Sequence, residues 1–332
     1  MEKRFEVPGP VLDEKGLPIP GWGSAGLLQY DRKEIGAPFY RIKEWDWYQV
    51  SDGEKALQFT FGHASYAGQV GVMLFDFAKG EKIFTKDVIL PLPFGSLGLG
   101  RSAEEDGVLL YDKKGMWMRL EKKGDSWILA CKCEDFAAEV TLTCNNPNAM
   151  VINIPFHESA TAFYYNHKIN CLTAKGKAQA YGKEYLFEEN AWGLLDWGRG
   201  VWPFHNEWYW SSASGWLGDE VFGFNLGCGF GNTENATENA LFYKKQIHKL
   251  GRVKIQPGTP YNQPWKLTDE DGRLDITLNP VYDRTTATKL LWVDNSCHQM
   301  FGQFTGFAVL DDGTRLQVEG ITGFAEHAIN NW

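Results

Sequence analysis

Hydrophobic and polar residues alternate along much of this 332-residue chain, in short runs that glycine- and lysine-containing turns separate. The segments 117–122 and 127–133 show the pattern clearly, and Lys122-Lys123-Gly124 lies between them. A period of two is typical of β-strands, whose side chains point alternately to opposite faces. Further runs of this kind lie at 56–61, 71–77, 83–90, 139–144, 151–155, 162–171, 221–230, 273–278, 289–293, 302–310 and 314–319. This spacing predicts antiparallel sandwiches or barrels.

Segments with a helical period of 3.6 residues are few. The clearest is 322–331, which begins at Thr322, a residue whose hydroxyl can cap a helix. We therefore expect an all-β protein with few short helices. The chain exceeds the length at which a single core usually stops growing, so two domains are expected. The charged stretch 173–190 predicts a boundary that gives domains 1–180 and 181–332, although this stretch also fits a long hairpin.

Composition excludes several classes of protein. An apolar fraction of 43% and an aromatic fraction of 14% are too high for a disordered chain. The net charge of −9, with no block of like charges, argues against nucleic acid or an anionic membrane as a partner. No run approaches 18 apolar residues and the start of the chain lacks the apolar region of a secretion signal, so we expect no membrane insertion and a cytoplasmic location.

Cysteine usage agrees with that compartment. The six cysteines are scattered, which predicts reduced core thiols rather than a disulfide framework. Cys131-x-Cys133 is not followed by a second ligand pair at zinc spacing. We therefore expect no metal and no cofactor, while a metal site assembled from distant residues would leave no such pattern.

Six of the fourteen tryptophans fall between Trp192 and Trp216. A tryptophan is large and apolar and carries one hydrogen-bond donor, so such a group builds either a bulky core or an aromatic-walled pocket. Asp196, Arg199 and His205 lie within the same segment, and their presence favours a pocket that binds a small molecule.

Asp196 has two interpretations. Alone among buried indoles, its carboxyl would have a raised pKa and would serve as a general acid near neutral pH. Paired with Arg199, it would instead form a buried structural ion pair, which is the interpretation that we favour slightly. His205 is either an acid or base near pH 7 or a residue at the rim, bonded to a loop.

Two predicted strands carry further candidates. In 162–171, Tyr164, Asn166 and Lys168 share one face, which either lines a lumen or faces water. In 221–230, glycines surround Asn225 on one face and leave room beside it for a ligand. Our catalytic candidates are Asp196, His205 and Glu238, and Glu326 receives less weight. The candidate ligand-binding residues are Trp197, Arg199, Trp202, Trp208, Trp210, Asn225, Tyr164, Asn166 and Lys168.

Several segments carry a resemblance to a known family. They are Tyr165-Asn-His-Lys-Ile-Asn-Cys171, Leu195-Asp-Trp-Gly-Arg-Gly-Val-Trp-Pro203, Phe224-Asn-Leu-Gly227, Glu238-Asn-Ala-Leu-Phe-Tyr243, Phe301-Gly-Gln-Phe-Thr-Gly306 and Gly323-Phe-Ala-Glu326. The chain resembles the DUF2804 family over nearly its whole length, and Asp-Trp-Gly-Arg-Gly-x-Trp is the most specific element. The resemblance implies two lipocalin-like (calycin) β domains, similar to the AttH proteins, carotenoid 1,2-hydratases and tocopherol cyclases.

Those relatives handle apolar molecules, and their enzymes begin by protonating a carbon–carbon double bond. The resemblance therefore favours an enzyme with a carboxylic acid in a tryptophan-lined pocket, acting by hydration, cyclisation or isomerisation. Two other hypotheses stay open. One is a non-catalytic carrier of a lipid-like ligand, and the other is a carbohydrate-active enzyme with paired carboxylates. The sequence specifies neither the substrate nor the oligomeric state.

Overall fold

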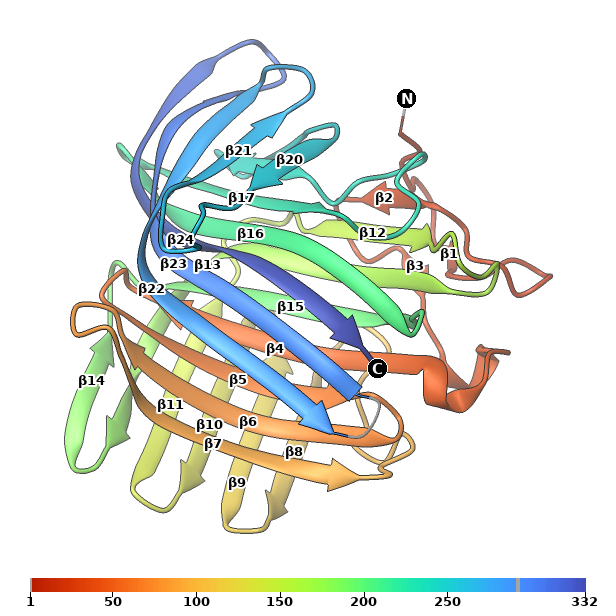
Figure 1. Cartoon of the computed structure of the whole chain (residues 1–332), viewed down its shortest axis with the longest axis horizontal. Coiled ribbons are helices and arrows are strands. Elements are labelled where there is room, and N and C mark those ends of the chain that lie inside the picture. Colours follow the sequence, from red (N-terminus) through yellow and green to blue (C-terminus); the bar gives the residue numbers. More distant parts are fainter. Residues whose placement is uncertain (1, 291–292) are drawn as a thin grey trace.

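The computed structural model describes residues 2–290 and 293–332, and these residues form two large curled sheets (Figure 1). The first sheet has 13 strands. They are β2 (Gly21–Gly23), β4 (Ile42–Ser51), β5 (Lys55–His63), β6 (Ala67–Asp76), β7 (Glu81–Pro91), β8 (Gly107–Lys113), β9 (Met116–Lys123), β10 (Ser126–Cys133), β11 (Phe136–Thr143), β12 (Met150–Pro155), β13 (Phe163–Ala180), β14 (Lys183–Phe187) and β15 (Trp192–Val201).

The second sheet has nine strands. They are β16 (His205–Leu217), β17 (Glu220–Cys228), β18 (Ala240–Tyr243), β19 (Gln246–Lys249), β20 (Val253–Gln256), β21 (Trp265–Asp269), β22 (Leu274–Leu290), β23 (Val293–Val309) and β24 (Arg315–Asn331). The short strands β1 (Gly9–Pro10) and β3 (Leu28–Gln29) pair with each other, and the 3₁₀ helices η1 (Arg32–Glu34) and η2 (Phe39–Arg41) precede β4.

Most neighbouring strands are joined by hairpins and run antiparallel. The order in the first sheet is β7-β6-β5-β4-β15-β13-β11-β10-β9-β8, and in the second it is β19-β18-β17-β16-β24-β23-β22-β21-β20. The turn between β8 and β9 has positive φ at Lys114 and Gly115, as tight hairpins with matching twist require. The all-β prediction is confirmed, and β9 and β10 coincide with the runs 117–122 and 127–133 to within one residue.

The helix expected at 322–331 is wrong, because this segment is part of strand β24. Apolar residues of this segment are buried on both faces. Phe324 contacts Trp47 of the first sheet, while Ala325 packs in the core of the second. A strand buried on both sides loses the simple alternation of polar and apolar positions, and its pattern then resembles that of a buried helix.

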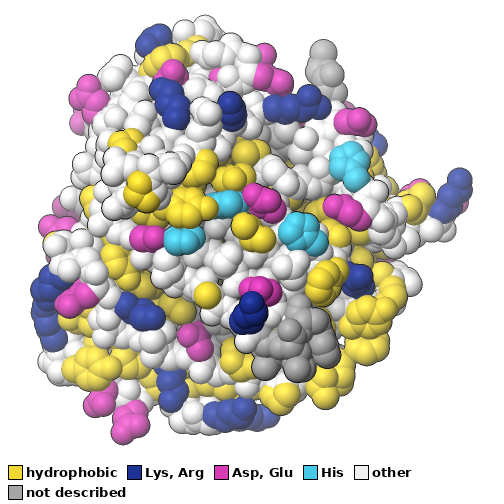
Figure 2. Space-filling model, in the orientation of Figure 1, with side chains coloured by type: hydrophobic (Ala, Val, Ile, Leu, Met, Phe, Trp, Pro, Cys, Tyr) yellow, Lys and Arg dark blue, Asp and Glu magenta, His cyan; other side chains and the backbone are white. Residues whose placement is uncertain are grey.

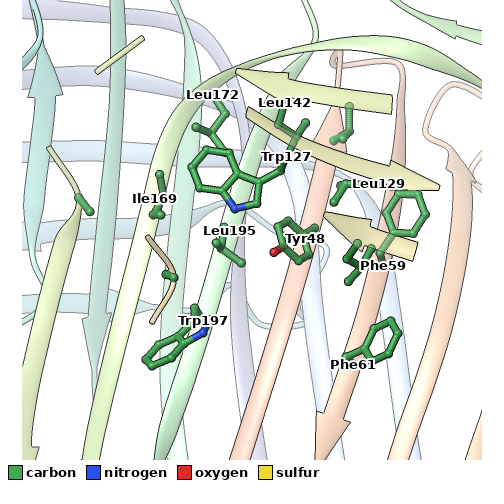
Figure 3. Packing of buried hydrophobic residues seen from close by; sticks show 14 of the residues in the cluster. Tyr48, Phe59, Phe61, Trp127, Leu129, Leu142, Ile169, Leu172, Leu195 and Trp197 are labelled. Carbon is green, nitrogen blue, oxygen red and sulfur yellow. The ribbon is translucent and has the colours of Figure 1, made fainter. Parts of the chain in front are cut away.

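The first sheet encloses a hydrophobic interior. Phe59, Trp127, Ile169 and Leu195 come from four different strands and point toward one another in Figure 3. Each of these side chains is buried. We call this space the interior of the first sheet. The second sheet has its own core, which includes Trp265.

Strand β13 divides two environments. Tyr165, His167 and Ile169 face the interior of the first sheet, while Lys168 faces Trp210 of the second sheet. The register of β13 against β15 shifts between Ile169 and Leu172, and Cys171 in this bulge has φ 59°. Ile169 and Leu172 consequently both point into the same interior, as Figure 3 shows.

The chain passes from one sheet to the other between β15 and β16. The Asp-Trp-Gly-Arg-Gly segment, which we assigned to a domain 181–332, therefore lies in a strand of the first sheet. The boundary of independently folding domains stays a prediction. All six cysteines are free.

Candidate functional site

The first part of the tryptophan-rich segment, Trp192–Val201, forms β15, and this strand is buried over its whole length. It pairs with β13 on one side and β4 on the other. Asp196 and Arg199 are three residues apart, and an odd separation places two side chains on opposite faces of a strand. The expected Asp196–Arg199 ion pair does not form. Each residue has a different partner.

Arg199 points into the interior of the first sheet and is fully buried. Its guanidinium lies 2.8 Å from the Asp46 carboxylate and donates to the carbonyl oxygens of Gly100, at 2.9 and 3.2 Å, and of Trp45, at 2.8 Å. It also stacks on Trp197 at 3.9 Å. Because the protein itself accepts most of the hydrogen bonds that this guanidinium can donate, we interpret Arg199 as a structural residue.

Asp196 points the other way, toward the second sheet. Its Oδ1 accepts from Lys168 Nζ at 2.9 Å and from Asn166 Nδ2 at 2.6 Å, and 11% of its side-chain surface is accessible. The Lys168 ammonium also lies 3.7 Å from the centre of the Trp210 ring, where the π-system attracts a cation. The Tyr164–Asn166–Lys168 face of β13 is buried. It faces neither open water nor the interior of the first sheet.

The second sheet contributes two carboxyl groups to the same region. Glu326 of β24 accepts from Trp208 Nε1 at 2.8 Å and from Gln299 Nε2 at 2.9 Å. Glu238 lies just before β18 and is 2% exposed, and its Oε2 has no hydrogen-bond partner among residues 2–290 and 293–332. Asn225 connects these groups, because its Oδ1 accepts from Trp210 Nε1 at 2.7 Å and its Nδ2 donates to the Glu238 carbonyl at 2.8 Å.

We call Asp196, Lys168, Glu238 and Glu326 the inter-sheet cluster. It holds three carboxyl groups and one ammonium, all buried. Burial raises the pKa of Glu238 to about 7, and the negative charges of Asp196 and Glu326 add to this, while Lys168 and the Tyr164 hydroxyl oppose it. Burial likewise raises the pKa of Glu326. Lys168 and Arg284 both oppose the rise in the pKa of Glu326, but two cations beside three buried carboxyl groups leave an excess of carboxyl groups, which favours retention of a proton near neutral pH.

The other predicted residues lie in different places. Trp197 belongs with Arg199 in the interior of the first sheet. Trp202 packs between the sheets, 5.1 Å from Tyr164 and 5.7 Å from Trp208, measured between ring centres. His205 is exposed at the start of β16, where its Nδ1 lies 2.9 Å from Asn331 Oδ1. The structure therefore does not bring His205 into the cluster.

A second group of polar residues lies near the molecular surface. Figure 2 shows histidine and acidic side chains among hydrophobic ones on one face of the molecule. His327 Nε2 lies 2.7 Å from Glu207 Oε1, and His327 Nδ1 lies 2.6 Å from the Tyr261 hydroxyl. His298 pairs with Asp283 at 2.9 Å. Glu207 of β16 thus has a histidine partner on the neighbouring strand β24.

A pocket of about 260 Å³ opens between the sheets beside the cluster. Leu194, Ser212 and Phe324 line it. They lie two residues along their strands from Asp196, Trp210 and Glu326, respectively. Trp192 and Trp216 also line this pocket, although the sequence analysis did not select them. Their membership in the tryptophan-rich segment was the available signal.

Two classes of site are not found. Residues 2–290 and 293–332 contain no group of three or more histidine, cysteine, aspartate or glutamate side chains arranged to hold a metal ion. Across the same residues, no helix is long and apolar enough to cross a membrane.

Comparison with known proteins identifies the family. Residues 2–332 match the model of a family described as a domain of unknown function, DUF2804, so this chain belongs to that family. The resemblance seen in the sequence is thereby confirmed. No curated protein matches the chain.

Solved structures share the fold at low sequence identity. An AttH-like protein from Nitrosomonas europaea has a TM-score of 0.59 at 14% identity, with 96% of this chain and 98% of that one covered. CghA in complex with Sch210972 has a TM-score of 0.56 at 10% identity, covering 97% and 96%. Kievitone hydratase from Nectria haematococca has a TM-score of 0.51 at 9% identity, covering 87% and 88%. These similarities agree with a lipocalin-like fold.

Proposed function

Starting from a DUF2804 protein with a proton-retaining cluster between its sheets, we propose that this chain is an enzyme acting on a small, apolar or partly apolar molecule. Glu238 is its general acid. The observation that carries the proposal is the excess of buried carboxyl groups over cations, which leaves the pKa of Glu238 at about 7. A group with that pKa is present as acid and as base in comparable amounts at neutral pH, which suits proton transfer in both directions.

The chemistry follows from where the charges lie. The Glu238 carboxyl donates its proton to one carbon of a carbon–carbon double bond, and the other carbon becomes cationic. The Asp196 carboxylate and the indole faces of Trp208 and Trp210 stabilise that cation. Water capture followed by proton return to Glu238 gives hydration. Capture by a group within the substrate gives cyclisation, and proton loss from a neighbouring carbon gives isomerisation.

The remaining residues orient the participants. Lys168 and Asn166 both contact Oδ1 of Asp196, which leaves Oδ2 without a hydrogen bond from the residues that the structure describes. The Oδ1 of Asn166 is buried and has no partner in the described part of the chain, so it can accept a hydrogen bond from a ligand hydroxyl or from a reacting water.

Two of the similar structures agree with this class of function. One is named as a hydratase, and another is a complex with the small molecule Sch210972. They share the fold with this chain at 9% and 10% identity, so they support the class and not the substrate.

The first test is infrared spectroscopy of the protein across pH 5 to 9. Protonated carboxylic acids absorb apart from carboxylates, so wild type should lose one acid band near pH 7, the pKa of Glu238. Glu238→Gln should lack that transition. Glu234→Gln is the matched control, because Glu234 is exposed on the same loop and should leave the transition unchanged.

The second test follows the chemistry. Uncharged alkenes and enol ethers are incubated with the enzyme in D2O, and deuterium at carbon is measured by mass spectrometry. We expect incorporation with wild type and with Glu234→Gln, and a loss of at least about 100-fold with Glu238→Gln. Equal incorporation in both variants would overturn the assignment of Glu238. A pocket that binds ligands without the infrared transition would instead indicate a carrier.

A further inference from the structure

The pocket of about 260 Å³ is lined by residues that lie two positions along a strand from residues of the inter-sheet cluster or from Trp210, which contacts it. Three strands show the same relation. Leu194 precedes Asp196 on β15, and Phe324 precedes Glu326 on β24, in each case by two residues. Ser212 follows Trp210 on β16 by the same interval. Residues two apart in a strand share a face and lie about 7 Å apart, so the pocket adjoins the carboxyl groups.

Phe324 lines the pocket and packs against two further rings, Trp210 and Trp47. The ring centres of Trp210 and Phe324 are 4.8 Å apart at 79°, and Trp47 lies 5.7 Å from Trp210 and 6.1 Å from Phe324. Such edge-to-face contacts present both ring faces and ring edges to a neighbour. Trp210 therefore contacts both Phe324, which lines the pocket, and the Lys168 ammonium of the cluster.

The pocket itself carries almost no charge. Among its lining residues that the structure describes, Asp52 is the only ionisable one, and its carboxylate pairs with Lys55. The other polar lining residues are neutral; they are Gln49, Ser51, Asn190, Ser212, Ser214 and Thr322. Ser212 accepts from Asn170 at 2.7 Å. A charged group placed here would lose its hydration without gaining a partner of opposite charge.

The mouth of the pocket is aromatic and leads to a wider space. The rings of Trp192 and Trp216 meet at 5.3 Å and 70°, and Trp216 is 46% exposed. Trp216 also lines an open groove of about 1370 Å³, whose wall includes Lys175, Glu188 and Glu189. The polarity of the surroundings therefore changes from neutral inside the pocket to charged outside.

We infer that the protein binds a molecule with a compact, uncharged end, which occupies this pocket between Trp192 and Phe324, and a polar remainder, which extends into the groove. The inference goes beyond the proposed function, because none of the four cluster residues lines this pocket. The volume is just below the range of about 300–1,000 Å³ that drug-sized ligands occupy, so a small ring system fits better than a complete lipid.

Two fluorescent probes test this inference without any turnover. N-phenyl-1-naphthylamine is uncharged, and 8-anilino-1-naphthalenesulfonate has the same two aromatic units with an added sulfonate. We expect the uncharged probe to bind at least about tenfold more tightly, because the pocket offers no cation to the sulfonate. Binding of both probes with equal affinity would overturn the uncharged character of the site.

Variants then locate the binding. Thr322 points across the mouth toward Gly53, so Thr322→Trp should fill the pocket and weaken binding of the uncharged probe at least about tenfold. Thr305→Trp is the matched control, because Thr305 is exposed on the same sheet outside the pocket. Trp216→Ala, which removes a half-exposed ring, is a second route to the same result and should weaken binding about threefold.

Unchanged probe affinity in both Thr322→Trp and Trp216→Ala would overturn the pocket assignment. That outcome leaves the infrared transition of Glu238 untouched, so failure of the pocket and failure of the acid are separate results. Conversely, Glu238→Gln should bind the uncharged probe as wild type does, because Glu238 does not line the pocket.

Discussion

The two faces of strand β15 carry two polar networks that differ in charge balance. On one face, Arg199 is matched by Asp46 and by backbone carbonyl oxygens. On the other, Asp196 is matched by Lys168, but Glu238 and Glu326 lie in the same buried region and add two more carboxyl groups. The first network satisfies its own charges. The second holds more carboxyl groups than cations, and burial raises the pKa of Glu238 to about 7 there.

This difference separates a structural role from a chemical one. A balanced pair holds strands together and has no reason to exchange protons at neutral pH. An unbalanced cluster makes the folded state less favourable, since like charges are confined together, and proteins retain such arrangements mainly at functional sites. The comparison therefore predicts that substitutions on the two faces have opposite consequences for stability.

The largest effect is expected for Arg199→Met. Burial raises the pKa of Asp46 and Arg199 opposes this, so the substitution leaves a buried carboxylate without its cation. The free energy of unfolding should fall by about 3–5 kcal/mol, measured by urea denaturation. The double variant Arg199→Met, Asp46→Asn should recover part of the loss. A loss below about 1 kcal/mol would show that the network is not structural.

The next effect is a dependence of stability on pH that belongs to Glu238. Its pKa is about 7 in the folded protein and 4.5 ordinarily, so between these values the folded state holds a proton that the unfolded chain has released. Stability from this group is full below pH 4.5 and declines until pH 7 is passed, by about 3 kcal/mol in total. The loss arises because a buried carboxylate then appears in the folded state.

Glu238→Gln should therefore match wild type near pH 5 and exceed its unfolding free energy at pH 8, with chemical denaturation at both values as the measurement. Glu234→Gln should follow wild type at each pH, which controls for the change in net charge. A variant that is less stable than wild type at pH 8 would mean that Glu238 is a stabilising carboxylate, and the cluster would then resemble the Arg199 network.

The smallest effect is expected for Asp196→Asn. Lys168 keeps the carboxyl groups of Glu238 and Glu326 within electrostatic range, so no buried cation is left unmatched. We expect a change of about 1 kcal/mol or less in unfolding free energy. The infrared transition of Glu238 should move to lower pH, because the Asp196 charge contributes to raising that pKa. If Asp196→Asn lowered the free energy of unfolding as much as Arg199→Met, the two faces of β15 would not differ as proposed.

The sequence predicted the strands more successfully than the contacts. Alternating runs and glycine turns reveal strands because both are local signals, and β9 and β10 followed them closely. The helix expected at 322–331 failed where a strand has two buried faces. The separation of Asp196 from Arg199 was available from the sequence, since an odd spacing in a strand excludes contact on one face.

The sequence did not predict that the four cluster residues lie together. Lys168, Asp196, Glu238 and Glu326 come from β13, β15, a loop and β24, so only the packing of one sheet on the other brings them together. Three of these were candidates for separate reasons. Glu326 received less weight, although its position two residues after Phe324 places it on the same face of β24.

The bulge at Cys171 has a consequence for how this chain tolerates insertions and deletions. One extra residue there changes which side of β13 is occupied by even-numbered positions. Deleting Cys171 would keep every side chain in the sequence and still misplace half of the strand, because Leu172 and Ala174 would exchange sides with their neighbours. Length at this point is therefore as strict a requirement as the identity of any one residue, and homologous chains should vary in composition here before they vary in spacing.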